Sequence, residues 1–192
     1  MNRLFKKELY DINRGYQAQV EDFKRKTELE EKLKLKDLER KCRIPHRIFE
    51  LSKNAKIIGI EKNKRNEELF VFKQRGGIFL DIRMCGESYW AINGLPTIST
   101  KIYEECHPGG PGIYIFDVQM VDDNIGNGSI AMKYLIGAAK EMGMSYIEGE
   151  LSPVDRDHFD RLEHYYTKFG FKVKFNKDRT AGKITLELNN SK

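Results

Sequence analysis

The sequence has few cysteines, few prolines and no long hydrophobic run. Its three cysteines, Cys42, Cys85 and Cys106, are an odd number without metal-site spacing, which argues against a disulfide framework and against zinc. No window approaches the roughly 18 uncharged apolar residues of a transmembrane helix. The basic first residues are not followed by an apolar segment, so no secretory signal is expected. These absences predict a cytoplasmic protein with no metal site and no membrane span.

A strong charge of one sign is also absent from most of the chain. Residues 1–45 carry 13 Lys and Arg against 9 Asp and Glu, whereas residues 46–192 carry 21 against 20. The basic excess therefore belongs to the N-terminal segment, whose interleaved acids argue against nucleic-acid binding. A length of 192 residues, 40% of them hydrophobic, suits one domain with an arm. We expect a charged helical arm over residues 1–45 and one domain over residues 46–192.

Residues 1–43 are predicted to be helical, because they contain no proline and one glycine. Pro45 is expected to end the segment, since proline is not accommodated in a helix interior. Two interpretations of the arm are open: one or two solvated helices packed on the domain, or an arm that binds a protein partner or self-associates. Apolar residues recur at helical spacing at Leu9, Ile12, Tyr16, Val20 and Phe23.

The remainder of the chain alternates between strand and helix patterns. Segments rich in β-branched and aromatic residues at 55–61, 68–73 and 78–82 predict an antiparallel meander. Residues 83–111, with three prolines, predict a long irregular loop. The expected fold class is α+β, because the order that follows is strand 113–120, helix 126–142, strand 145–151, helix 157–169, and strands 171–175 and 184–188.

The turn between strand 113–120 and helix 126–142 carries the most informative motif, Asp123-Asn124-Ile125-Gly126-Asn127-Gly128-Ser129. The N–H groups that begin a helix lack intrahelical partners, and the helix dipole adds positive charge there, so the turn can bind a phosphate. Glycines let an anion approach the backbone closely, and a serine hydroxyl adds a donor. Taken alone, a glycine-bearing turn is also ordinary structure.

Together with a second motif further along the sequence, the glycine-bearing turn makes this half of the chain resemble the GNAT acetyltransferase superfamily. The signature of that family is a strand, Q/R-x-x-G-x-G/A, a helix, a strand, a second helix and a Y-x-x-x-G-F tail. Asp123 to Gly128 occupies the first motif, and Tyr166 to Phe171 fits the second. The resemblance covers about residues 112–176. It implies a twisted mixed β-sheet flanked by helices, preceded here by the charged helical arm.

The resemblance also implies an activity, the transfer of an acetyl group from acetyl-CoA to a primary amine by direct attack. Strands 113–120 and 145–151 would then run parallel and splay apart around the pantetheine arm. The acceptor is left open by the sequence. The implied cofactor-binding residues are Val118, Met120, Asn124, Ile125, Gly126, Asn127, Gly128, Ser129 and Lys168.

Tyr166 is the residue that the resemblance implies as the acid protonating the leaving thiolate. It shares an apolar helix face with other core candidates, so it could instead fill the core, and Tyr165 is expected to face elsewhere. Candidate bases are Asp117, Glu148 and Glu150. Glu148 and Glu150 share one strand face, which fits a solvent-facing edge equally well.

Four positions depart from the family pattern. Asp123 stands where Gln or Arg is usual, and a carboxylate beside a pyrophosphate is unfavourable unless it turns away. Phe159 and Leu162 replace an Asn-x-x-Ala pattern, and Tyr114 stands near the position of a usual glutamate. These departures leave an alternative open, a catalytically inactive interaction module that acts through its arm.

Two further groups in the long loop are candidates for function. The dipeptide Cys106-His107 matches no zinc pattern, so we expect it to be incidental. The remaining candidates suit a cationic amine acceptor, or only pack the loop: Tyr89, Trp90, Tyr103, Glu104 and Glu105.

Overall fold

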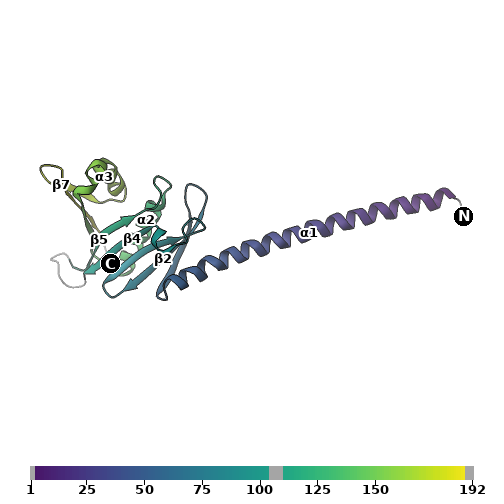
Figure 1. The fold of residues 1–192 in the computed structure, drawn as a ribbon, viewed down its shortest axis with the longest axis horizontal. Helices are drawn as coiled ribbons and strands as arrows, with labels where there is room; N and C mark the ends of the chain where they lie inside the picture. The colour runs from purple at the N-terminus through teal and green to yellow at the C-terminus, as the bar shows by residue number, and fades with distance from the viewer. Residues whose placement is uncertain (1–2, 104–109, 189–192) are drawn as a thin grey trace. The chain divides into compact units, whose positions relative to one another are not determined.

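The computed structural model describes residues 3–103 and 110–188 of the chain (Figure 1). The chain divides into two compact units, Met1–Arg43 and Ile44–Lys192, which we call the arm and the body. Helix α1 (Arg3–Leu51) forms the described part of the arm and continues into the first residues of the body. Within the described ranges, no helix combines the length and the apolar character that crossing a membrane requires.

Helix α1 runs through Pro45, so the expectation that this proline ends the helical segment is wrong. A proline inside a helix removes one backbone hydrogen bond and crowds the preceding turn, at a cost of about 3 kcal/mol. Ile44 and Ile48 lie on either side of it, and both are buried in the core of the body. Burying such a side chain contributes about 1.5–3 kcal/mol, so the packing of these two residues offsets the cost of the proline.

The arm, taken by itself, is a single helix. Its apolar positions Ile12, Tyr16 and Phe23 are exposed. Ion pairs between residues one turn apart lie on the helix surface, as between Lys26 and Asp22, whose charged atoms are 2.9 Å apart. Partner binding or self-association through this helix stays a prediction.

The body is built on one eight-stranded sheet in the order β1-β2-β3-β4-β5-β6-β8-β7. Neighbouring strands are antiparallel except β5 and β6, which are parallel. The meander of β1 to β3, the parallel pair and the α+β class are therefore confirmed. The strands are β1 (Ala55–Lys62), β2 (Glu68–Gly76), β3 (Phe79–Cys85), β4 (Thr97–Tyr103), β5 (Gly112–Gln119), β6 (Tyr146–Leu151), β7 (Lys172–Phe175) and β8 (Gly182–Glu187).

Residues 83–111 are not the long irregular loop that was expected, because they include β4 and the short 3₁₀-helix η1 (Ile92–Gly94). Ile98, Thr100 and Ile102 of β4 alternate with more exposed residues and are buried. The Thr100 hydroxyl donates a hydrogen bond to the Leu80 carbonyl oxygen over 2.6 Å, which satisfies this buried polar group. Pro96 stands just before the strand, where it removes no ladder hydrogen bond.

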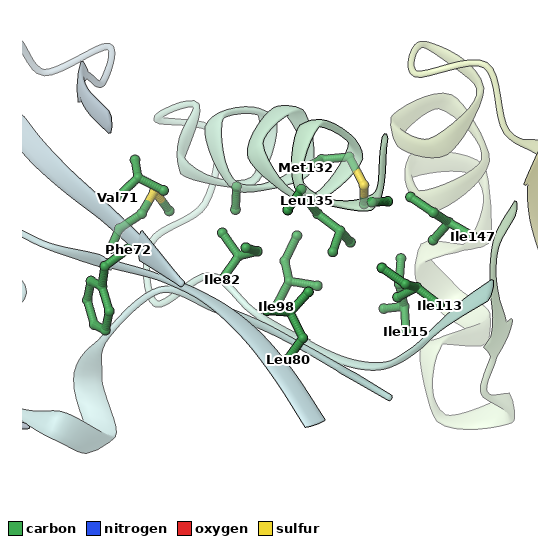
Figure 2. Close-up of a cluster of buried hydrophobic side chains, with 14 of the residues drawn as sticks. Val71, Phe72, Leu80, Ile82, Ile98, Ile113, Ile115, Met132, Leu135 and Ile147 are labelled. Carbon is green, nitrogen blue, oxygen red and sulfur yellow. The ribbon is translucent and has the colours of Figure 1, made fainter. Parts of the chain in front are cut away.

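Helix α2 (Asn127–Glu141) connects the parallel strands β5 and β6 and packs on the sheet from β3 to β6. Figure 2 shows Met132 and Leu135 of this helix over Ile82 and Ile98, within one continuous core. The second helix of this half is a 3₁₀-helix, η2 (Pro153–His158), followed by α3 (Phe159–Thr167). Residues 120–126 connect the end of β5 to the start of α2 and form the turn that carries the glycine motif.

Candidate functional site

The turn between β5 and α2 has the backbone geometry of an anion site. Gly126 caps the helix with φ of 94°, in the left-handed region that disfavours side chains. The N–H of Lys64, in the β1–β2 turn, donates to the Ile125 carbonyl oxygen over 2.8 Å and so fixes the turn from outside. The N–H groups of Asn127 and Gly128 have no acceptor within the helix because they belong to its first turn. They are therefore available to a ligand.

A cavity of about 460 Å³ opens at this turn, and we call it the loop cavity. The predicted cofactor-binding residues line it with one exception, Ile125, whose side chain is buried and whose carbonyl oxygen accepts from Lys64. The lining residues are Lys64, Val118, Met120, Val121, Asp122, Asp123, Asn124, Gly126, Asn127, Gly128, Ser129, Arg161, Leu162, Tyr165 and Lys168.

Asn127 is the most informative residue in the wall of the loop cavity. Its side chain is 1% exposed, and neither Oδ1 nor Nδ2 makes a hydrogen bond of ordinary geometry to any residue that the structure describes. A buried polar group without a partner costs about 1–3 kcal/mol. Such a group at a helix N-terminus, in the wall of a cavity, is what a bound polar ligand would satisfy.

Charged side chains of both signs surround the loop cavity. Asp123, which stands where the family pattern has Gln or Arg, forms an ion pair with Arg161 of α3 over 3.1 Å. Its negative charge is therefore balanced by a cation. The Lys168 ammonium donates to the Ser129 hydroxyl oxygen over 2.7 Å. Three cations, Lys64, Arg161 and Lys168, therefore line the cavity together with two carboxylates.

The second carboxylate, that of Asp122, also interacts with neighbouring side chains. It accepts a hydrogen bond from the Tyr89 hydroxyl over 2.7 Å, and Arg65 lies 3.6 Å away. Burial, together with this hydrogen bond, raises the pKa of Tyr89 to about 12, and the neighbouring Asn127 amide opposes the rise. Tyr89 is thus a buried anchor of the β5–α2 turn.

The two adjacent tyrosines of α3 have different environments. Tyr165 lines the loop cavity, and its hydroxyl donates to the Gly128 carbonyl oxygen over 2.7 Å, whereas Tyr166 lines neither cavity. Tyr166 is 5% exposed and packs edge-on against Phe171, with ring centres 5.5 Å apart. Burial and the Asp155 carboxylate raise the pKa of Tyr166 to about 12, so it stays protonated at neutral pH.

Strands β5 and β6 stop pairing after their fourth parallel pair, Ile115 with Gly149. A Cβ on Gly149 would lie 2.9 Å from the Ile115 carbonyl oxygen, so only glycine allows the strands to approach this closely. The next residue, Phe116, is an extra residue in the ladder with β4, a β-bulge. Pairing between β5 and β6 therefore ends within the sheet and leaves an opening between the two strands.

A second cavity, of about 510 Å³, lies at this opening, and we call it the divergence cavity. Aromatic rings, lysines and one carboxylate form its walls. The lining residues are Tyr114, Ile115, Phe116, Glu150, Leu151, Ser152, Pro153, Lys174, Phe175, Asn176, Ala181, Gly182 and Lys183.

The three candidate bases are placed differently. Glu150 lines the divergence cavity. Glu148 forms an ion pair with Lys183, whose Nζ lies 2.7 Å from a carboxylate oxygen. Asp117 is exposed, accepts from the Gln119 amide over 2.8 Å and lies outside the walls of both cavities. Burial, with the nearby Glu150 and Glu148 carboxylates, raises the pKa of Tyr114, so this tyrosine is a poor base.

Other candidates from the sequence lie away from the two cavities or outside the described residues. Trp90 lies against Arg47, and Tyr103 packs edge-on against Tyr114. Glu104, Glu105 and the Cys106-His107 pair fall outside the described ranges. Over residues 3–103 and 110–188, no group of three or more His, Cys, Asp or Glu could hold a metal ion.

The analysis of the sequence missed several residues of the loop cavity, among them Lys64, Arg161 and Tyr165. Lys64 comes from a distant hairpin, and no local pattern connects it with the motif. Arg161 and Tyr165 stand on the same face of α3 as Leu162 and Lys168, so helical spacing counted back from Lys168 would have found them.

Comparison with known proteins identifies a relative in sequence. No family model matches the chain. The chain is 32% identical over 167 residues to "Uncharacterized protein YocC" of Bacillus subtilis (strain 168), a match that covers 84% of this chain and 93% of the relative. The chain belongs to the YocC family.

A solved structure shows the fold of this YocC-family chain. The GNAT domain of S. lividans PAT matches with a TM-score of 0.50 at 9% sequence identity, over 68% of this chain and 96% of that domain. The body therefore has the GNAT fold, as the two sequence motifs indicated. In this YocC-family chain the loop cavity and the divergence cavity both border β5 of that fold.

Proposed function

We propose that the body is an acyl-CoA-dependent N-acyltransferase, which moves an acetyl group from acetyl-CoA to a primary amine. The buried Asn127 side chain, whose polar atoms make no hydrogen bond of ordinary geometry to the described residues, carries this proposal from the wall of the loop cavity. It stands beside open helix N–H groups and cations, the chemistry that a diphosphate requires. The GNAT fold of the body supports the same function.

Binding of acetyl-CoA is assigned to the loop cavity. The N–H groups of Asn127 and Gly128 would donate to the diphosphate, and the left-handed Gly126 keeps Cβ atoms away from it. Lys64 and Lys168 would add positive charge on the two sides of the cavity. Main-chain groups of β5 near its end, at Val118 and Met120, would bond the pantetheine arm where β6 no longer pairs with β5.

Proton transfer is assigned to one tyrosine and two glutamates. Tyr166 would protonate the departing thiolate, since its hydroxyl remains protonated at neutral pH. Glu150 and Glu148 would attract the acceptor ammonium at the divergence cavity and take its proton, directly or through water. Asp117 is not assigned a role, because it is exposed and its carboxylate accepts a hydrogen bond from the neighbouring Gln119 amide.

Calorimetric titration of acetyl-CoA tests this proposal. A Gly128→Asp variant places a carboxylate at the diphosphate position, whereas Gly137→Asp makes the same change in the same helix, where the added atoms meet open space. We expect micromolar binding by the parent and by Gly137→Asp, and at least a ten-fold loss for Gly128→Asp.

A lysine pair provides an independent control. Lys168→Met removes a cation that lines the loop cavity. Lys172→Met removes another exposed lysine, which pairs with Glu187 and does not line this cavity. Only the first substitution should weaken binding. A folded protein that fails to bind millimolar acetyl-CoA would contradict the transferase and favour the alternative, an inactive module that acts through its arm.

A further inference from the structure

The divergence cavity already contains a primary amine that belongs to the chain itself. Lys183 of β8 lines this cavity, and its Nζ lies 2.7 Å from the Glu148 carboxylate oxygen. The Lys183 side chain is 56% exposed, whereas the Glu148 side chain is 11% exposed. The ammonium therefore stands at the surface of the cavity with a largely buried carboxylate beneath it.

The sheet register places this amine close to the opening between β5 and β6. Lys183 is directly opposite Glu150, the first residue of β6 beyond its last pair with β5. Glu148 is directly opposite Tyr114 of β5. Lys183 thus stands one strand away from the position at which the strands separate and where, under the proposed function, the thioester would lie.

We propose that the chain acylates its own Lys183 at this site, with acetyl-CoA as the donor. This inference rests on the proposed function. It differs from that function because the acceptor is a residue of the same chain, and it makes an alkyl ammonium of the lysine type the class of amine that the divergence cavity accommodates.

The reaction balances with the groups present and one acetyl-CoA. The Lys183 ammonium gives a proton to Glu148, and the free amine attacks the thioester carbonyl carbon, so that a C–N bond forms. The C–S bond then breaks, and the leaving thiolate takes a proton from Tyr166. The attacking nitrogen also loses its second proton, which is released to water, and the proton held by Glu148 restores Tyr166 through water. The products are therefore Nε-acetyl-lysine, CoA thiol and one proton.

The contact with Glu148 holds the Lys183 ammonium in place and puts a proton acceptor beside it. The hydrogen bond to that carboxylate raises the pKa of Lys183, so the side chain enters the reaction as an ammonium. A proton acceptor must therefore touch it, and Glu148 does so at 2.7 Å. Acylation removes the charge of Lys183, after which an incoming acceptor ammonium meets Glu148 and Glu150 without competition from that side chain, while Lys174 still lines the cavity.

Lys172 is a matched lysine outside the cavity. It lies on the neighbouring strand β7, pairs with Glu187 over 2.9 Å and is 69% exposed. Uncatalysed acetylation of lysines depends on exposure, and Lys172 is more exposed than Lys183. Faster acetylation of Lys183 than of Lys172 would therefore mean that the divergence cavity promotes the reaction.

The test is incubation of the purified full chain with isotope-labelled acetyl-CoA, followed by intact-mass measurement and peptide mapping. We expect one acetyl group, on Lys183, formed at a rate independent of protein concentration. Lys183→Arg keeps the charge and should abolish the label, whereas Lys172→Arg should leave it unchanged. Glu148→Gln should slow labelling at least about ten-fold, since it removes the proton acceptor.

Two outcomes would overturn the proposal. Label spread over Lys172 and other surface lysines at equal rates would show uncatalysed chemistry only. An unlabelled Lys183 in a protein that binds acetyl-CoA by calorimetry would exclude self-acylation and leave the proposed function intact, whereas absence of acetyl-CoA binding would overturn both.

Discussion

The Tyr165 hydroxyl donates a hydrogen bond to the Gly128 carbonyl oxygen over 2.7 Å, and this bond joins α3 to the first turn of α2. The Tyr165 ring is also covered by the Lys168 ammonium, 5.0 Å from the ring centre. A residue adjacent to the proposed acid thus shapes the wall of the loop cavity. The two tyrosines should therefore separate binding from chemistry.

Tyr165→Phe removes this bond while it keeps the ring. We expect the free energy of unfolding to fall by about 1 kcal/mol and acetyl-CoA affinity to fall several-fold, because the first turn of α2 loses an anchor. Chemical denaturation and calorimetry measure the two quantities. Unchanged affinity would show that the turn holds its geometry without Tyr165.

Tyr166→Phe should have the complementary effect. If Tyr166 protonates the thiolate, the rate of CoA thiol release falls about 100-fold or more, while the affinity for acetyl-CoA is unchanged. Thiol release with Nα-acetyl-lysine amide as the acceptor probe measures this rate. A Tyr166→Phe variant that keeps the full rate would assign this residue to the core alone.

Asp123→Asn is expected to tighten acetyl-CoA binding. The carboxylate now holds Arg161 over 3.1 Å at the edge of the loop cavity, and its removal frees this guanidinium for a phosphate. We expect a several-fold gain in affinity that diminishes at high salt, with stability changed by less than about 1 kcal/mol because the pair is exposed. Asp160→Asn is the matched control, since Asp160 pairs with Arg179 and does not line the cavity.

Part of the fold could be predicted from the sequence because local patterns carry it. The β5–α2–β6 unit has the clear alternation of period two and period 3.6, and its turn glycines stand where the backbone needs them. β4 was missed because the proline before it and the glycines after it outweighed the alternation of Ile98, Thr100 and Ile102. The prediction that the helix ends at Pro45 failed for a related reason, because the rule for proline considers only neighbouring residues and not the packing of the helix on the core.

The candidate site was predictable only within the two local motifs. The motif located Gly126, Asn127 and Gly128, and the second motif located Lys168. Lys64 reaches the same cavity from the β1–β2 turn, and Lys183 reaches Glu148 from β8. Such contacts depend on sheet order and register, which a single sequence does not specify locally.

Gly149→Ala should destabilise the body and disturb the opening between β5 and β6. The new Cβ would lie 2.9 Å from the Ile115 carbonyl oxygen, so the last parallel pair must move apart. We expect a loss of about 1–3 kcal/mol in the free energy of unfolding, with weaker acetyl-CoA binding. Gly137→Ala has open space and should be neutral or stabilising by up to about 1 kcal/mol. Equal stability of the two variants would contradict the close approach at Gly149.

Stability should also decline at alkaline pH through Tyr89. Burial and the hydrogen bond to Asp122 raise its pKa from 10.0 to about 12, so the folded protein keeps a proton that the unfolded chain releases. The contribution is complete below pH 10 and is lost as the pH rises through about 12, on the order of 2–3 kcal/mol. Denaturant titrations between pH 8 and 12 should show a smaller decline for Tyr89→Phe than for the parent, while Tyr16→Phe, at an exposed position of the arm, should follow the parent. Parallel profiles for the Tyr89→Phe variant and the parent would mean that the Tyr89–Asp122 contact does not hold the phenol protonated.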